Sequence, residues 1–192
     1  MKLGLRIIII IALQTAALVV MVGMKQYTLS TGVPIVVKTE PIDPRSLFSG
    51  DYVRLNYTIS QLPIDKLDGD KEFERNDDIY VVVRQEGEFW EAISVYRAMP
   101  SVLSGQVVIK GRVEYVSDRN WRARGQTPER VKTINVKYGV ENYYVPEGEG
   151  RVLERPKPDE TLSIRLVVDK NGNAAIKAVL VNGTERYVEK VF

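Results

Sequence analysis

The sequence predicts a mostly β protein, in which a single antiparallel β-sheet domain, barrel-like or sandwich-like, follows one N-terminal transmembrane helix. Three observations lead to this prediction. Residues 7–24 carry no charged side chain, apolar and polar residues alternate along much of the remaining chain, and turn sequences such as Asn182-Gly183 separate the alternating segments. We place the anchor in residues 1–26 and the β domain in residues 27–192.

The predicted membrane helix is the run from Ile7 to Met24, in which Ile, Leu, Val, Ala and Met dominate. At ~1.5 Å per residue, such a run nearly crosses a hydrocarbon core of ~30 Å. Lys2 and Arg6 precede the run, so the positive-inside rule predicts a cytoplasmic N-terminus and an extracytoplasmic domain at the cell membrane. A cleaved signal peptide is the alternative, but Met21-Val22-Gly23-Met24 does not resemble a cleavage site. We therefore expect an uncleaved anchor in the lipid bilayer.

The first half of the domain contains several expected strands. Residues 35–37 form a short apolar run, and residues 53–59 alternate in polarity, as in a half-buried strand. Two further strands, 79–83 and 89–96, flank the turn sequence at 85–88 and therefore predict a hairpin.

The second half combines a further strand, a long loop and a meander. Apolar residues that share one face, Val107 to Tyr115, predict the strand. A three-strand antiparallel meander is expected over 162–168, 174–181 and 184–191, because turn sequences join these segments. Between them, residues 116–160 are expected to form a long ordered loop region.

One short helix is expected within that loop region. Pro128 is favoured at the first position of a helix, which predicts a short helix that begins at 127–131. The charged stretch from Asp65 to Arg75 is expected to contain a turn.

The composition excludes several functional classes. Lys and Arg number 27 and Asp and Glu number 25, so the chain lacks the basic excess of a nucleic-acid-binding protein. It has no cysteine and no histidine, which excludes disulfides, thiolate nucleophiles, histidine general bases and the commonest metal ligands. We expect no nucleic-acid partner, no metal and no cofactor, and any catalysis would need carboxylates, Lys, Tyr or a Ser activated by Lys.

The most distinctive segment runs from Gly50 to Tyr57 and spells G-D-Y-x-x-L-x-Y. It follows Asp43-Pro44-Arg45, and together the two segments predict a structured loop that leads into a strand. On these residues the chain resembles the GDYXXLXY family of membrane-anchored bacterial proteins, and the segments 109–113 and 138–148 fit as well. The resemblance implies an exported protein with one anchor, which is a subunit or partner of a polytopic membrane protein.

A binding surface is predicted where the motif and a tyrosine-rich segment combine. In this hypothesis Asp51 and Arg54 fix the loop, and the tyrosines supply contact area at a low entropic cost. Two alternatives stay open: the charges only hold the loop together, and the tyrosines are core residues at strand ends. The candidate binding residues are Asp43, Arg45, Asp51, Tyr52, Arg54, Tyr57, Tyr138, Glu141, Tyr144 and Glu147.

The first function predicted is a binding or assembly module that is not an enzyme. The alternative is a Ser-Lys hydrolase distantly similar to type I signal peptidases, with Ser46 or Ser49 as the nucleophile and Lys110 as the base. When the segments are aligned on Gly50-Asp51, however, the position expected to hold the nucleophile is Ile42. A third alternative is an envelope structural protein without a discrete ligand.

Overall fold

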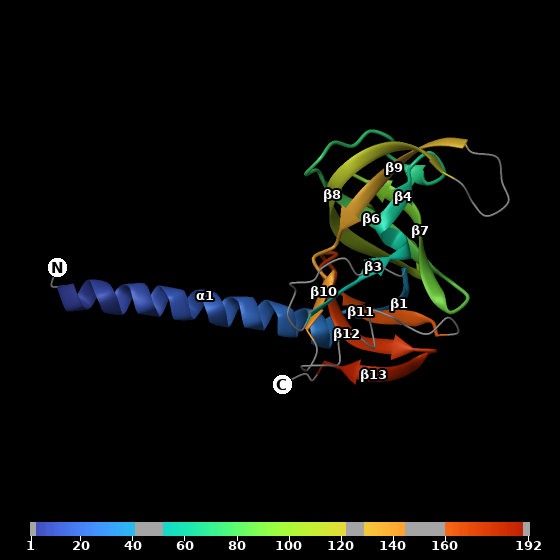
Figure 1. The fold of residues 1–192 in the computed structure, drawn as a ribbon. Coiled ribbons are helices and arrows are strands. Elements are labelled where there is room, and N and C mark those ends of the chain that lie inside the picture. Colours follow the sequence, from blue (N-terminus) through green and yellow to red (C-terminus); the bar gives the residue numbers. More distant parts are fainter. Residues whose placement is uncertain (1–2, 41–51, 122–128, 145–159, 190–192) are drawn as a thin grey trace.

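A long helix projects from a domain that is built almost entirely of strands (Figure 1). The computed structural model describes residues 3–40, 52–121, 129–144 and 160–189. The predicted fold class, a mostly β domain after one N-terminal helix, is confirmed.

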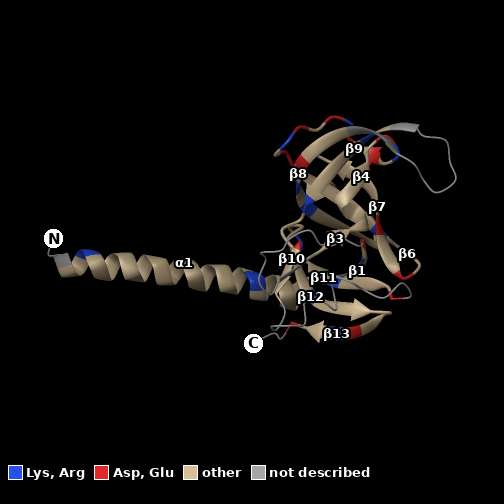
Figure 2. Cartoon of the chain, viewed as in Figure 1, with Lys and Arg blue, Asp and Glu red and all other residues tan. Residues whose placement is uncertain are grey.

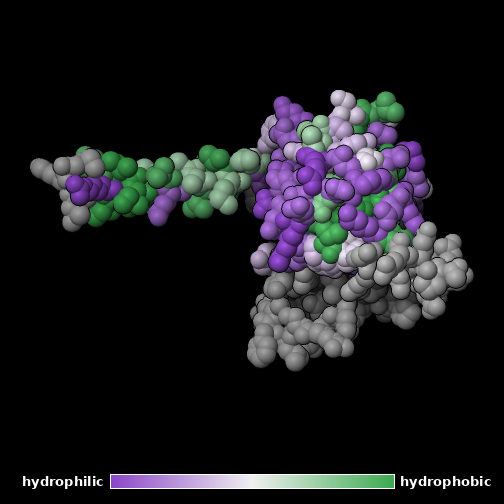
Figure 3. Space-filling model, turned by 90° about the horizontal axis from the view of Figure 1, so that it is seen from above, coloured by the Kyte–Doolittle hydropathy of each residue, from purple (hydrophilic) through white to green (hydrophobic). Residues whose placement is uncertain are grey.

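The helix α1 (Leu3–Thr31) has 29 residues and is long and apolar enough to cross a membrane. Its apolar side chains point outward, and Leu13 and Val22 are 71% and 67% exposed. No charge colour lies between the two ends of the helix, and its surface is largely hydrophobic, whereas the visible face of the domain is largely hydrophilic (Figures 2 and 3). An N-terminal helix of this kind is a membrane anchor or a signal sequence.

The first sheet has five strands in the order β13-β12-β11-β1-β3. Their bounds are β1 (Val33–Glu40), β3 (Asn56–Tyr57), β11 (Leu162–Val168), β12 (Ala174–Val181) and β13 (Thr184–Val188). The predicted meander is confirmed as β11 to β13. Its second turn depends on Asn182 and Gly183, which both have positive φ angles, of 51° and 76°, as a type I′ turn requires.

The second sheet has six strands in the order β4-β9-β8-β6-β7-β5 and curves like half of a barrel (Figure 1). Their bounds are β4 (Gln61–Pro63), β5 (Asp68–Gly69), β6 (Asp78–Glu86), β7 (Phe89–Tyr96), β8 (Gln106–Trp121) and β9 (Glu129–Lys137). The predicted hairpin is confirmed as β6 and β7. Buried side chains from both sheets, including Val37, Ile109 and Ile164, form one continuous core cluster.

Where the structure describes residues 116–160, the expected loop is wrong over 116–121, 129–137 and 142–144, which are strands, and the expected helix is wrong over 129–131. Residues 116–121 continue β8, and 129–137 form β9, which pairs with β8 along most of its length. The segment E-R-V-K-T-I-N-V-K is rich in β-branched residues, and Val131, Ile134 and Val136 turn inward. The pairing with β8 therefore favours a strand over a helix at 129–131, and Pro128 lies outside the described residues.

A β-bulge changes the face of the last residue in the expected 107–115 strand. The pairing of β8 with β9 shifts between Val113 and Tyr115, so Glu114 is an extra residue. Val113 is fully buried, but Tyr115 is 44% exposed. The expectation that Tyr115 shares the face of Val107 and Ile109 is therefore wrong, because the bulge reverses the alternation.

The expected strand at 53–59 is divided into three short elements. Tyr52–Arg54 form β2, which pairs with β10 (Asn142–Tyr144), whereas β3 pairs with β1. Thr58–Ser60 form the 3-10 helix η1. Leu55, Tyr57 and Ile59 are nevertheless buried, so the alternation correctly marked the inward-facing residues.

The last turn of α1 packs against the domain. Leu29 is buried with Val167 and Ala175, and the Thr28 hydroxyl donates a 2.9 Å hydrogen bond to the Asp169 carboxylate. Only Gly32 separates the helix from β1, and a Cβ atom there would lie 2.7 Å from the Thr28 carbonyl oxygen. Helix and sheet are thus joined directly at Gly32.

Asp169 organises the β11–β12 turn at this joint. Its carboxylate accepts the backbone N–H groups of Asn171 and Asn173, at 2.9 and 3.0 Å, in addition to the Thr28 hydroxyl. The backbone N–H of Lys110 in β8 donates to the Gly172 carbonyl at 2.8 Å. The turn therefore links α1, the first sheet and the second sheet.

The Asp169 carboxyl makes the stability of this joint depend on pH. Burial opposes its ionisation, but hydrogen bonds from Asn173, Thr28 and Asn171 outweigh burial and lower its pKa. A carboxyl with a lowered pKa stabilises the fold above its unfolded pKa, near ~3.9, and this contribution is lost as the pH falls through the folded pKa. We expect the difference in unfolding free energy between wild type and Asp169→Asn to be constant near neutral pH and to shrink below about pH 4. Urea unfolding at several pH values measures it, and a difference that stays constant into the acid range contradicts the prediction.

Candidate binding site at the G-D-Y-x-x-L-x-Y strand

The strand of the motif lies beside the tyrosine-rich segment. In the β2–β10 pair, Tyr52 is opposite Tyr144 and Val53 is opposite Tyr143. The backbone N–H of Leu55 extends the contact with a 2.7 Å hydrogen bond to the Glu141 carbonyl. The structure therefore brings together the two segments that the sequence combined in one predicted surface.

Two tyrosines fasten these segments to each other. The Tyr57 side chain is fully buried, and its hydroxyl donates to the carbonyl oxygen of Val140, 83 residues away. Tyr138 is also buried, and its hydroxyl donates to the Ile59 carbonyl at 2.6 Å. Burial raises the pKa of both phenols, and the negative charge of Glu141 raises it further. Both hydroxyls therefore stay protonated donors, and we call this pair of bonds the tyrosine clasp.

Glu141 closes the turn that precedes β10. Its carboxylate accepts the backbone N–H groups of Tyr138 and Gly139, the second at 3.0 Å. Gly139 has a φ of 80°, which favours glycine at this position. Glu141 therefore shapes the segment that carries Val140 and Tyr144, the acceptor of the clasp and the exposed end of β10.

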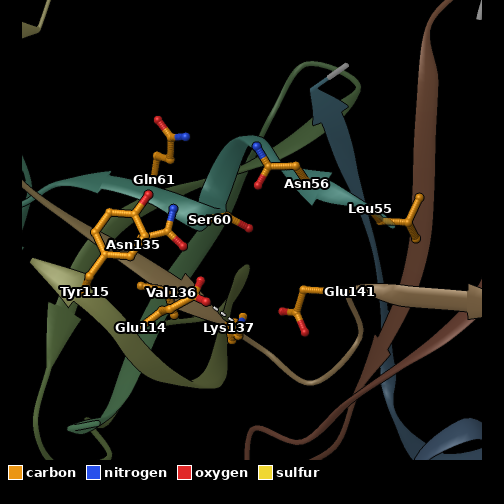
Figure 4. A pocket seen from close by; sticks show the side chains of 10 residues that line it. All are labelled: Leu55, Asn56, Ser60, Gln61, Glu114, Tyr115, Asn135, Val136, Lys137 and Glu141. Carbon is orange, nitrogen blue, oxygen red and sulfur yellow. Dashed lines mark ion pairs between the residues drawn. The ribbon is translucent and has the colours of Figure 1, made fainter. Parts of the chain in front are cut away.

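A polar hollow of about 420 Å³ (Figure 4) is lined in part by Ser60 and Glu141. These two side chains accept hydrogen bonds from the backbone N–H groups of the clasp residues Tyr57 and Tyr138. The walls of the hollow come from the end of the motif, from η1, and from facing parts of β8 and β9. Lys137 Nζ lies 2.5 Å from Glu114 Oε1 across its floor, and Tyr115 forms an aromatic wall. The lining residues are Leu55, Asn56, Ser60, Gln61, Glu114, Tyr115, Asn135, Val136, Lys137 and Glu141.

The hollow can form hydrogen bonds with a polar ligand. Asn56, Gln61 and Asn135 provide amide groups that both donate and accept, which suits the main chain of another protein. In the described ranges, no cluster of three or more acidic side chains is placed to hold a metal ion.

Among the aromatic side chains that the structure describes at the site, Tyr144 is the most exposed. It is 76% exposed, whereas its neighbour Tyr143 is 8% exposed. Because β10 is an extended strand, alternate side chains point to opposite sides. Tyr144 therefore points outward from a strand that the tyrosine clasp holds in place.

The other predicted binding residues differ in where they lie. Tyr57 and Tyr138 are core residues of the clasp, which is the alternative the sequence left open. Tyr52 and Arg54 lie in β2, where only the backbone is described. Asp43, Arg45, Asp51 and Glu147 lie outside the described residues.

Of the three residues suggested for Ser-Lys catalysis, only Lys110 lies in the described ranges. Its ammonium is 3.1 Å from Asp78 Oδ2, and its side chain is 39% exposed. Arg112 and Lys110 together lower the pKa of the Asp78 carboxyl. A general-base lysine needs a desolvated site without a paired carboxylate, and Lys110 has neither property. Ser46 and Ser49 lie outside the described residues.

Several residues of the hollow were not among the predicted candidates. Asn56 occupies a variable position of the motif, and Asn135 and Lys137 fall where a loop was expected. Tyr115 was assigned to the inner face. Only Asn56 carried a signal, because it lies on the polar face of an alternating segment.

Comparison with protein-family models finds a match to the family described as GDYXXLXY protein, over residues 14–179. The matched range extends from within α1 to β12 and includes the clasp, the hollow and the joint at Asp169. Neither the curated proteins nor the solved structures provide a match.

Proposed function

The chain belongs to the GDYXXLXY family, and we propose that it is a membrane-anchored extracytoplasmic assembly module that binds a polytopic membrane protein. In this proposal α1 is an uncleaved anchor in the cell membrane of a bacterium. Its N-terminus is cytoplasmic, and the β domain stands on the other side of the bilayer. The Tyr144 strand and the adjoining hollow form the contact surface.

The surface of α1 supports the anchor. The most apolar part of the helix has no residue buried against the rest of the protein. Backbone polar groups of a helix are satisfied internally, so such a segment is stable in lipid. The packed joint at Thr28 and Leu29 also supports an uncleaved helix, because cleavage before the domain would remove contacts of the fold.

The observation that carries the assembly role is the exposed Tyr144 on a fixed strand. Tyrosine is enriched at protein interfaces, because it supplies a large contact area with few rotatable bonds. The tyrosine clasp and the Leu55–Glu141 hydrogen bond hold β10 from one side. An exposed aromatic side chain, on the strand that follows the hollow residue Glu141, suits a protein partner better than a small substrate.

An in-cell photo-crosslink tests this proposal. A benzophenone amino acid replaces Tyr144 in the full-length anchored chain, and adducts are identified by mass spectrometry. We expect one discrete adduct with a membrane protein. The same probe at Glu88, on the exposed tip of the β6–β7 hairpin, is the matched control and should not give this adduct.

A second variant connects the adduct to the geometry of the site. Glu141→Ala removes the carboxylate that shapes the turn before β10 but leaves Tyr144 unchanged. We expect the adduct to weaken in this variant while circular dichroism stays that of a folded domain. If probes at Tyr144, Tyr115 and Gln61 all give no adduct, the assembly role is rejected.

A further inference from the structure

A groove lies at the junction of α1 and the β11–β12 turn, and it shares Ala175 with the Leu29 contact. Its volume is about 620 Å³. One end is apolar, with Val20 and Met24 58% and 63% exposed, and Gly23 leaves open space where a side chain would lie. The other end is polar and includes Lys25, Asn171 and Asn173.

The apolar end of the groove lies at the depth of the acyl chains of a bilayer, and the polar end lies at the depth of the headgroups. This step rests on the proposed function, in which α1 is an anchor. Met24 is the last residue of the charge-free run, and Thr28 lies only ~6 Å further along the helix axis. The turn that Thr28 binds through Asp169 therefore lies at the level of the lipid headgroups, whereas Val20 lies at the level of the acyl chains.

The charges of the groove favour an anion at the headgroup level. The Asp169 carboxylate is turned inward and accepts hydrogen bonds from Thr28, Asn171 and Asn173. Lys25, by contrast, forms no ion pair with another residue that the structure describes, and Lys170 is exposed on the same turn. Basic residues at the membrane surface attract anionic lipids.

We propose that this groove binds one anionic phospholipid, with its phosphate at Lys25 and Asn171 and an acyl chain along Val20, Gly23 and Met24. A phospholipid has matching parts in the same order, with apolar acyl chains at one end and an anionic headgroup at the other. Phospholipids also surround an anchored helix on all sides, so an apolar groove at this depth contacts lipid and not water. The bound lipid would extend the contact between helix and turn that Thr28 and Asp169 begin.

Native mass spectrometry of the full-length protein tests the site. The protein is reconstituted with equimolar phosphatidylglycerol and phosphatidylcholine and then released from detergent in the spectrometer. We expect one retained phosphatidylglycerol per chain. Lys25→Gln should lower its retention roughly fivefold, since a basic residue near the surface contributes this much to the binding of anionic lipid. Lys66→Gln, in the turn between β4 and β5, is the control for charge and should not change retention.

A variant in the apolar half keeps every charge. Gly23→Leu is accommodated by the helix, because nothing lies within 4 Å of the position of its Cβ, but its side chain fills the groove. We expect it to lose the lipid, whereas Val22→Leu, outside the groove, should retain it. Equal retention by wild type and Gly23→Leu would show bulk lipid only and overturn the proposal.

The same variants separate this inference from the assembly role. If Gly23→Leu removes the Tyr144 adduct and leaves lipid retention unchanged, the groove binds a partner helix and the lipid proposal is wrong. If lipid is retained and the Tyr144 adduct is absent in wild type, the assembly role fails and the lipid site stands.

Discussion

Replacing Tyr57 with Ala is expected to lower the free energy of unfolding by about 3–5 kcal/mol, the range for removing a large aromatic ring from a core. Tyr57 is fully buried in the cluster shared by both sheets, and its hydroxyl satisfies the Val140 carbonyl. The variant loses the packing of the ring and the clasp at once. Urea unfolding of the full-length protein in detergent, followed by circular dichroism, measures the change.

Tyr57→Phe is the matched control, because it keeps the ring and removes only the hydroxyl. It should cost about 1–2 kcal/mol, the range for losing one hydrogen bond and leaving the Val140 carbonyl unsatisfied. A Tyr57→Ala variant as stable as Tyr57→Phe would mean that the ring contributes no packing. A Tyr57→Phe variant as stable as wild type would mean that the clasp hydrogen bond contributes nothing.

Asp169→Ala is expected to cost about 3 kcal/mol, because hydrogen bonds to a buried charged group are worth more than neutral ones and several donors lose their acceptor together. The Thr28 hydroxyl and the N–H groups of Asn171 and Asn173 are those donors. The same urea unfolding experiment measures this loss. Glu86→Ala removes an exposed ion pair with Arg84 and should change stability by less than about 0.5 kcal/mol.

A double-mutant cycle isolates the part of this effect that joins the helix to the domain. Thr28→Val removes the hydroxyl donor and keeps the shape of the side chain. If Thr28 and Asp169 stabilise the joint through their hydrogen bond, the two variants should show a coupling energy of about 1 kcal/mol. Additive effects of the two substitutions would show that the helix and the turn do not stabilise each other through this bond.

Local patterns predicted the parts of the fold whose partners are close in sequence. The hairpin of β6 and β7 and the meander of β11 to β13 each join neighbouring strands through turn residues, so a short window contains the necessary information. Asn182-Gly183 shows this clearly, because its backbone conformation is one that few other residue pairs adopt. The N-terminal helix was also predicted from a local pattern, a long run of apolar residues.

The pairings between distant segments could not be predicted. No local pattern shows that β2 pairs with β10, and this pairing, together with the clasp, brings the motif and the tyrosine segment together. The bulge at Glu114 was equally hidden, and it decides that Tyr115 faces the hollow. Whether a tyrosine near a strand end points inward or outward depends on such long-range pairings and bulges.

The tyrosines of the candidate site illustrate this limit. The sequence predicted three tyrosines equally as contact residues: Tyr57, Tyr138 and Tyr144. The structure places the first two in the core, where they fasten the site, and leaves only Tyr144 exposed. The motif therefore marks the position of the site more reliably than it marks the residues available to a partner.

The direct junction of α1 with β1 at Gly32 has a consequence for the direction in which the domain faces. An α-helix turns by ~100° and advances ~1.5 Å with each residue. One additional residue between Met24 and Thr28 would therefore rotate an anchored domain by more than a quarter turn about the helix axis while raising it very little. In the proposed anchored protein, the length of this short stretch therefore sets the direction, parallel to the membrane, in which Tyr144 points.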